Sequence, residues 1–421
     1  MKKLSAILNL LLLAAALHAQ DVVTTLAGRP LVSGGMNGTG TNALFSDPAA
    51  VVADATGNYY IADSQNDAIR KMTPGGAVTT FAGQLGVPGT ANGTGTGAQF
   101  NSPCGLAFDA AGNLYVSDTG NNLIRKVTAA GVVSTYAGVA GPGGFLDGAA
   151  GSALFAAPLG LAVSTNGTVF LADSGNHCIR KISGGVVTTF AGSPQVWGSA
   201  DGTGTNAQFN APCGLKLDGR GILFLSDANN HTIRKINTNG VVTTFAGVAG
   251  LDGTADGNLA VARFRGPAEL AFDQQGNLLV ADSFNQTIRK ISTKGVVSTV
   301  CGAPGIAGTA SGTNGVGRFF NPYGLVVAAD GSLIVVDAYN ELLRTVIVPF
   351  NLSVQLVGGS HAATIIWDAV IGRKYQVQFK SDLTAADWTN LGPVLTATDY
   401  TLGAMDNSAT GMKVYRVLLL P

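Results

Sequence analysis

Reactive side chains stand just after a proline that recurs along the chain. Cys104, Cys213 and Tyr323 each lie between such a proline and a glycine. Glu269 replaces that glycine in one copy, and Lys216 replaces a small residue slightly further on in another. One acid, one amine, two thiols and a phenol form a set of groups that could contact a ligand. The alternative is that these residues vary neutrally at positions that have only a structural role.

A second group of polar residues directly follows a recurring Asp-x-x-Asn motif. The set comprises Asp67, Asn122, His177, His231, Gln286 and Glu341. Two histidines could begin a metal site, but zinc requires three or four ligands, so ordinary turn residues are the simpler interpretation. No GxSxG, HExxH or glycine-rich phosphate motif stands in a suitable context. We therefore expect no catalytic residue and no cofactor, and a channel metal ion has no support from the motifs.

An internal repeat of about 55 residues sets the positions of all these groups. An aspartate recurs in every copy, and proline, phenylalanine, asparagine, arginine and glycine positions keep the same phase. The aspartates are Asp63, Asp118, Asp173, Asp227, Asp282 and Asp337. Within one unit, residues 103–138, turn residues bound four short apolar or alternating runs. Four antiparallel strands repeated radially form a blade, so the sequence predicts an all-β protein with a six-bladed β-propeller.

The two ends of the repeat array predict how the ring closes. The sixth unit stops after its third strand, at about residues 342–348, and lacks the Val-Val-Thr-Thr run that completes the other units. A spare copy of that run lies at residues 22–28. We expect this segment to pair with residues 342–348 and complete the last blade, because closure removes the exposed sheet edges.

Three segments of each unit resemble the NHL repeat: Phe-x-x-Pro-x-Gly-Leu, Gly-Asn-Leu-Tyr-Val-x-Asp and Asn-x-x-Ile-Arg-Lys. The resemblance covers residues 22–348 and implies a propeller. NHL propellers include binding modules, kinase sensor domains and a peptidyl-amidating lyase, so the fold implies no single function. Cys104, Cys213 and Tyr323, in alternate blades, resemble the threefold disposition of metal-binding histidines in that lyase. No histidine occupies these positions, so lyase chemistry is not supported.

Chain direction assigns the connections to two faces of the propeller. The linkers of roughly 20 residues between blades and the turns of the second polar group share one face, which we call the long-loop face. The innermost strands begin there, so the reactive residues should gather at the mouth of the central channel. We expect ligand contact at Cys104, Cys213, Lys216, Glu269 and Tyr323, with Trp197 and Arg265 at the rim. Trp197, Phe145 and Tyr323 could also form an aromatic rim for stacking on a sugar.

These features favour a non-enzymatic binding or scaffold propeller that recognises a protein, peptide or glycan. A metal-dependent hydrolase or lyase, similar to a lactonase or to the peptidyl-amidating lyase, is the alternative. The chain has 25 basic and 25 acidic residues, which provides no attraction to nucleic acid or to an anionic membrane. Cys104 and Cys213 should lie too far apart across the channel to form a disulfide.

The regions outside the repeats predict two further parts. Residues 1–19 combine two lysines, an apolar stretch and a final alanine, the pattern of a signal peptide. We expect cleavage near Ala19 and a secreted, periplasmic or cell-surface protein, with the propeller at residues 20–349. Residues 350–421 break the period, and Trp367 followed by Tyr375 resembles the core pattern of a fibronectin type III module. This region predicts a small β-sandwich-like module, and no segment after residue 19 predicts a membrane span.

Overall fold

The chain is represented by a computed structural model. It describes residues 22–313, 315–347, 352–356, 362–368, 374–382, 384, 387–398, 401–408 and 413–420. The chain divides into a compact unit at Asp21–Ile347 and another that contains Val348–Pro421. The signal peptide expected at residues 1–19 lies outside the described residues. Within those residues, no helix is long and apolar enough to cross a membrane.

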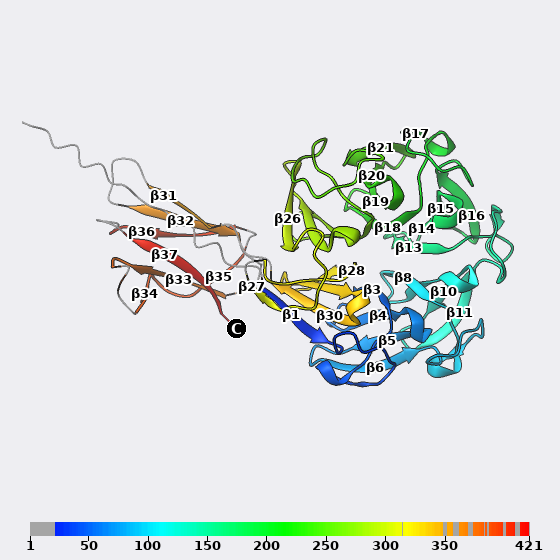
Figure 1. Cartoon of the computed structure of the whole chain (residues 1–421), viewed down its shortest axis with the longest axis horizontal. Helices are drawn as coiled ribbons and strands as arrows, with labels where there is room; N and C mark the ends of the chain where they lie inside the picture. The colour runs from blue at the N-terminus through cyan, green and yellow to red at the C-terminus, as the bar shows by residue number, and fades with distance from the viewer. Residues whose placement is uncertain are drawn as a thin grey trace, which may run out of the picture. The chain divides into compact units, whose positions relative to one another are not determined.

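Six antiparallel sheets of five strands form the blades of the propeller, and five of their inner strands are labelled around its centre in Figure 1. The innermost strands, which begin at the recurring proline, are β3 (Pro48–Ala53), β8 (Pro103–Phe108), β13 (Pro158–Val163), β18 (Pro212–Leu217), β23 (Pro267–Phe272) and β28 (Pro322–Val327). The second strands, which end at the recurring aspartate, are β4 (Tyr59–Asp63), β9 (Leu114–Asp118), β14 (Val169–Asp173), β19 (Leu223–Asp227), β24 (Leu278–Asp282) and β29 (Leu333–Asp337). The third strands, which carry the recurring arginine, are β5 (Ala68–Met72), β10 (Leu123–Val127), β15 (Cys178–Ser183), β20 (Thr232–Ile236), β25 (Thr287–Ile291) and β30 (Leu342–Ile347).

The outer part of each blade contains one strand more than the sequence predicted. The fourth strands are β6 (Ala77–Ala82), β11 (Val132–Ala137), β16 (Val186–Ala191), β21 (Val241–Ala246), β26 (Val296–Gly302) and β1 (Val22–Ala27). Beyond them lie two-residue strands from the linkers, namely β2 (Gly38–Thr39), β7 (Gly93–Thr94), β12 (Gly148–Ala149), β17 (Gly202–Thr203), β22 (Gly257–Asn258) and β27 (Gly312–Thr313). Two residues are too few to produce an alternating pattern, so the sequence predicted only four strands per blade.

Short 3₁₀ turns connect strands on the long-loop face and within the linkers. Those between the second and third strands are η2 (Ser64–Asn66), η4 (Thr119–Asn121), η5 (Ser174–Asn176), η7 (Ala228–Asn230), η8 (Ser283–Asn285) and η9 (Ala338–Asn340). Those in the linkers are η1 (Gly40–Asn42), η3 (Gly95–Gly97) and η6 (Gly204–Asn206).

The predicted ring closure is confirmed. Strand β1 pairs with β30 antiparallel, with Val22 opposite Ile347 and Ala27 opposite Leu343. On its other side β1 pairs with β27, so the first strand of the propeller lies inside the sheet of the last blade. Val23 and Ala27 are fully buried there.

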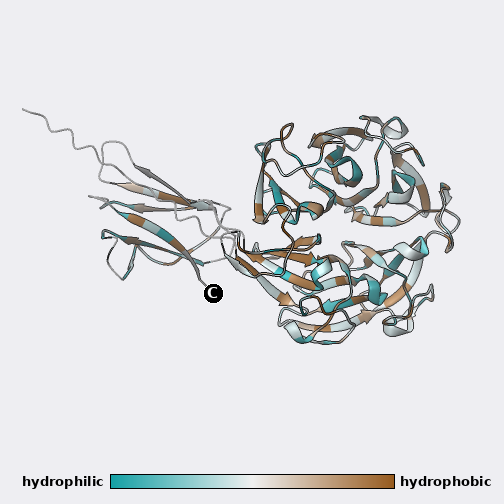
Figure 2. Ribbon diagram, in the orientation of Figure 1, coloured by the Kyte–Doolittle hydropathy of each residue, from teal (hydrophilic) through white to brown (hydrophobic). Residues whose placement is uncertain are grey.

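Apolar side chains fill the spaces between neighbouring blades. One core cluster combines Ala162 and Ala172 of blade 3 with Leu215 and Leu225 of blade 4. In Figure 2 the brown, hydrophobic segments lie mainly on the strands. Burial of these alternate strand residues is the main source of the ring's rigidity, because it is repeated at each blade interface.

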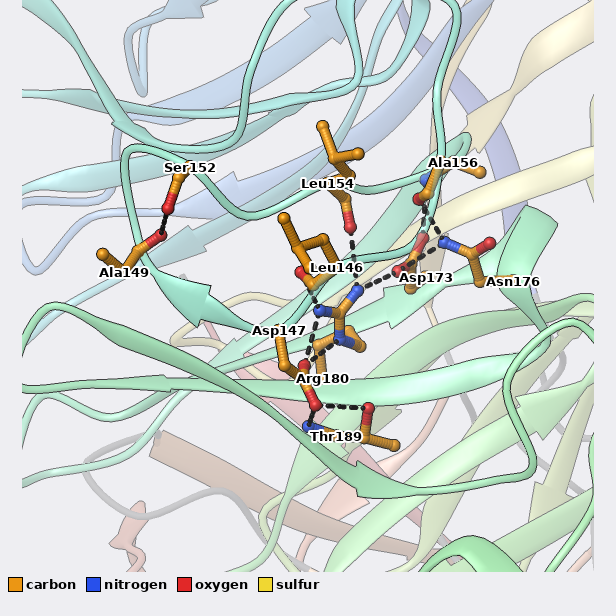
Figure 3. Close-up of polar contacts among 11 residues, drawn as sticks. Leu146, Asp147, Ala149, Ser152, Leu154, Ala156, Asp173, Asn176, Arg180 and Thr189 are labelled. Carbon is orange, nitrogen blue, oxygen red and sulfur yellow. Dashed lines mark hydrogen bonds and ion pairs between the residues drawn. The ribbon is translucent and has the colours of Figure 1, made fainter.

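A buried ion pair at the recurring aspartate and arginine holds each linker onto its own blade. In blade 3, Arg180 Nη1 lies 2.7 Å from Asp173 Oδ2, and Asn176 Nδ2 also donates to this oxygen. Arg180 donates as well to the linker carbonyls of Leu146 and Leu154, as Figure 3 shows. The six equivalent Arg–Asp distances are 2.6–3.2 Å, and all of these side chains are at most 1% exposed. These contacts give the recurring aspartate, asparagine and arginine a structural role in every blade.

The linkers also supply polar side chains to this network. Arg180 Nη2 lies 2.6 Å from Asp147 Oδ1, and Asp147 accepts a further bond from the Thr189 hydroxyl. The equivalent linker residues, from blade 1 to blade 6, are Asn37, Asn92, Asp147, Asp201, Asp256 and Ser311. The long linkers are therefore fixed to the blades rather than free to move as loops.

The second unit consists of two small sheets that share one core. Strands β31 (Leu352–Leu356), β32 (Ala363–Asp368) and β36 (Thr401–Asp406) form the first sheet. Strands β33 (Lys374–Lys380), β34 (Thr389–Asn390), β35 (Leu395–Thr396) and β37 (Val414–Leu420) form the second. Trp367 and Tyr375 come from different sheets, and their rings lie 6.0 Å apart in the core. This unit is the small C-terminal β region that the sequence predicted.

Candidate functional site

Two of the expected site residues meet at the mouth of the channel. Adjacent inner strands contact one another around the ring, and β23 separates β18 from β28. Even so, Cys213 Sγ on β18 lies 3.0 Å from Tyr323 Oη on β28. The contact passes over Ala268, the small residue at the equivalent position of β23. The tyrosine side chain therefore reaches across the channel entrance.

The thiols and the phenol at this entrance are held in their protonated forms. Burial raises the pKa of the Cys213 thiol to about 12, and it also raises the pKa of Cys104. Burial raises the pKa of Tyr323 well above 10.0. Cys104 Sγ lies 3.5 Å from Ser64 Oγ, and no disulfide joins it to Cys213, as the sequence predicted. Protonated thiols are weak nucleophiles and weak metal ligands.

Glu269 and Lys216 line the wall of the channel from adjacent strands. Gly214, the counterpart of Glu269 in blade 4, has no room for a side chain because its Cβ would meet the Ala268 carbonyl. Glu269 is only partly exposed, and burial raises the pKa of its carboxyl to about 7. The positive charge of Lys216 lowers that pKa, but the two groups form no ion pair in the described part of the chain. Glu269 Oε1 instead accepts the backbone N–H of Leu270 at 3.2 Å.

The two expected rim residues are exposed. The Trp197 side chain is 69% exposed on the linker into blade 4. Arg265 Nε lies 3.1 Å from Asp252 Oδ2, and about half of each side chain is exposed. Phe145, by contrast, lies 4.6 Å beneath the Arg180 guanidinium, where it supports the buried network. Of the three aromatics expected to form a sugar-stacking rim, only Trp197 is both on a linker and largely exposed.

The second polar group forms a ring of hydrogen bonds between consecutive blades. Each of its six members has positive φ and accepts a backbone N–H from the residue just before the proline of the next blade. The donors are, in the same order, Ser102, Ala157, Ala211, Gly266, Asn321 and Asp47. These residues therefore join the blades to one another. Among the described residues, no group of three His, Cys, Asp or Glu side chains could share a metal ion.

The donors near the channel do not match the metal site that the lyase resemblance implies. The sequence supplies no histidine at the recurring position, and the two thiols there carry raised pKa values. Zinc requires deprotonated thiols or neutral imidazoles, so this donor set does not fit a zinc site.

One of these inter-blade bonds makes stability depend on pH. His177 Nδ1 accepts the Ala211 N–H at 3.1 Å, so the neutral ring with its proton on Nε2 is the bonded form. Burial lowers the pKa of His177 from 6.5, so the unfolded chain binds this proton more readily. The stabilisation is complete above pH 6.5 and is lost as the pH falls through the folded pKa.

We expect the parent to lose up to about 1 kcal/mol more unfolding free energy between pH 7 and pH 5 than His177→Gln. Glutamine retains the acceptor but does not titrate, and Gln286 already fills the equivalent position in blade 5. Urea denaturation at each pH measures the difference. Parallel pH profiles for the two proteins would contradict the role of His177.

Two units of the array match a known sequence repeat. The sequence profile of the NHL repeat matches residues 100–127 and 155–182, two consecutive units of the array. Their recurring proline, aspartate, asparagine and arginine are in phase with those of the other four blades. The chain therefore contains NHL repeats, matched directly in blades 2 and 3.

Two curated proteins are similar to the chain in sequence. It is 28% identical over 334 residues to NHL repeat-containing protein 2 of Bos taurus, covering 70% of this chain and 46% of that protein. It is 28% identical over 276 residues to Protein SUPPRESSOR OF QUENCHING 1, chloroplastic, of Arabidopsis thaliana, covering 61% of this chain and 26% of that protein. The matches thus span less than half the length of either relative.

Solved structures show the same propeller fold. A protein of unknown function from Bacteroides thetaiotaomicron has a TM-score of 0.60 and 20% identity, covering 78% of this chain and 76% of that one. An auxiliary nutrient binding protein from the same organism has a TM-score of 0.59 and 14% identity, with the same coverage. At these identities the likeness concerns the fold alone.

Proposed function

We propose that this NHL propeller is an exported, non-enzymatic binding protein whose long-loop face recognises a protein, peptide or glycan. One observation carries the proposal. The Cys213–Tyr323 contact links blades 4 and 6 at the channel entrance, whereas the rim of the same face exposes Trp197 and the Arg265–Asp252 pair. A rigid ring with a varied, exposed rim is suited to surface recognition.

The same proposal assigns roles to the two ends of the chain. Residues 1–19 would direct export and be removed near Ala19, which leaves a secreted, periplasmic or cell-surface protein. The module at residues 350–421 would serve as an attachment or adhesion domain. The proposal includes no nucleic acid, because the balanced charge of the chain provides no attraction to it, and it includes no membrane-spanning segment.

Two exposed Arg–Asp pairs on opposite faces provide the test. Arg265 pairs with Asp252 on the long-loop face, and Arg220 pairs with Asp218 in a turn on the other face. Ligands are first selected from a displayed peptide library and an oligosaccharide array, and the strongest is then measured by isothermal titration. We expect Arg265→Ala to weaken its affinity at least tenfold and Arg220→Ala to leave it unchanged. A larger loss of affinity in Arg220→Ala than in Arg265→Ala, or no ligand from either source, would overturn the proposal.

A metal-dependent hydrolase or lyase is the second candidate, and Glu269 is the observation that favours it. A carboxyl with a pKa of about 7 in a channel wall is suited to general acid–base chemistry. Metal analysis of the purified protein separates the two candidates. A stoichiometric metal ion that is lost in Glu269→Gln would support the enzyme.

A further inference from the structure

Each blade presents one pair of facing residues on the long-loop face. The first member lies two residues before the recurring proline. The second is the middle residue of the 3₁₀ turn between the second and third strands. In every blade the backbone N–H of the second member donates to the carbonyl of the first. The pairs are, from blade 1 to blade 6, Ser46 and Gln65, Asn101 and Gly120, Ala156 and Gly175, Asn210 and Asn229, Arg265 and Phe284, and Phe320 and Tyr339. The scaffold therefore holds six side-chain pairs in equivalent positions.

The side chains of these pairs differ strongly around the ring. Blades 2 and 3 carry Gly120 and Gly175, where a Cβ would lie only 2.6 and 2.9 Å from the facing residue. Blades 5 and 6 carry three large aromatic rings instead, Phe284, Phe320 and Tyr339, which are 53%, 37% and 49% exposed. We call these three residues the aromatic ledge. Exposed aromatics on adjacent blades are unexpected for a surface without a ligand, because scattered single residues are the norm.

The rings of the ledge are held in place before any ligand binds. Phe320 and Tyr339 pack edge to face, with centroids 5.1 Å apart and planes at 90°. The Phe284 ring packs over Gly266, where a Cβ would approach it to 2.5 Å. Gly266 is the only glycine among the six equivalent positive-φ positions. Rigid aromatic rings lose little conformational entropy on binding.

A hydrogen bond joins the two blades that carry the ledge. Gln286 Oε1 of blade 5 accepts the Asn321 N–H of blade 6 at 2.6 Å. Gln286 lies two residues after Phe284, and Asn321 directly follows Phe320. This bond fixes the spacing of the rings on the two blades.

The charged groups beside the ledge neutralise each other's charge. Arg265 faces Phe284 as the other member of its pair, and its guanidinium contacts the Asp252 carboxylate at 3.1 Å. A charged ligand would have to break this pair. An uncharged ligand with many hydroxyls can instead accept from the guanidinium and donate to the carboxylate.

The faces of the aromatic side chains favour one class of uncharged ligand. An aromatic face carries partial negative charge, so it attracts the polarised C–H groups on the face of a pyranose ring. We infer that the aromatic ledge, together with Arg265 and Asp252, binds an uncharged oligosaccharide. This inference rests on the proposed function of the long-loop face and names the class of ligand.

The experiment uses printed cello-, xylo-, manno-, laminari- and chito-hexaoses, with polygalacturonate as a charged probe and a displayed peptide library as a separate arm. The strongest neutral ligand is titrated against the full mature protein. Phe284→Ala and Phe320→Ala should each weaken binding at least tenfold. Gly266→Asn should weaken it by a similar factor, because asparagine, already present at this position in blade 6, displaces the Phe284 ring without removing it.

Val186→Ala is the control, because Val186 is an exposed apolar residue at the start of β16, beside a turn on the opposite face. Its affinity should change less than twofold. Binding of polygalacturonate alone, or loss of binding in Val186→Ala but not in the ledge variants, would overturn the inference. A peptide ligand sensitive to Arg265→Ala, with no hexaose bound, would overturn the inference and leave the proposed function standing. No ligand in any arm would overturn both.

Discussion

Arg180→Ala is expected to lower the free energy of unfolding by about 3–5 kcal/mol, the usual loss when one partner of a buried ion pair is removed. The substitution leaves the Asp173 carboxylate without a counter-ion at a fully buried position. Burial already raises the pKa of Asp173, and Arg180 opposes that rise. The linker carbonyls of Leu146 and Leu154 also lose their donor. Urea denaturation of the full chain, followed by circular dichroism, measures the loss.

Arg220→Ala is the matched control for this substitution. Arg220 lies 3.0 Å from Asp218, but its side chain is 79% exposed, so solvent screens the pair. We expect its loss to change the unfolding free energy by less than about 1 kcal/mol. Equal losses in the two variants would show that burial of the Arg–Asp pair contributes nothing to the stability of the blade.

Deletion of residues 22–27 is expected to prevent a stable, monodisperse propeller. The deletion leaves β30 and β27 without their shared partner and exposes two strand edges in one blade. It also removes the fully buried side chains of Val23 and Ala27. Size-exclusion chromatography with light scattering should show aggregates, and the thermal unfolding transition should shift down or disappear.

A pair of substitutions in the same strand provides the control for the deletion. Val23→Asp places a charge in the core, whereas Thr24→Asp places one at an exposed position next to it. Only Val23→Asp should reproduce the effect of the deletion. A deletion variant that melts like the parent would refute the closure of the ring through β1.

Recurrence within the sequence was enough to predict the scaffold. Asp173, Asn176 and Arg180 each have counterparts in all six units, so their structural role and the blade count could be inferred without a structure. The spare Val-Val-Thr-Thr run predicted the strand pairing of the last blade for the same reason. The repeat identifies the residues that every blade needs, because all six blades pack against their neighbours in the same way.

Residues that differ between blades were harder to assign. Cys213 and Tyr323 were placed at one channel mouth, but their direct contact depends on how far one phenol reaches across the ring. Phe284, Phe320 and Tyr339 have no aromatic counterparts in the other four units, so the repeat pattern does not predict that they form one surface. Alignment of the residue pairs that face each other across the 3₁₀ turns would have revealed the ledge.

The position of β1 also bears on the order of events during synthesis. Residues Val22–Ala27 are made before any blade, yet their partner Leu342–Ile347 completes the propeller. At about 5–20 residues per second, the first strand waits roughly a quarter of a minute to a minute for that partner. During this time the growing chain is an open arc of blades that cannot become a ring. Closure joins the most distant strands of the propeller, and contacts of such long sequence separation form slowly. The ring can therefore close only after Leu342–Ile347 has been made, whatever the order in which the earlier blades fold.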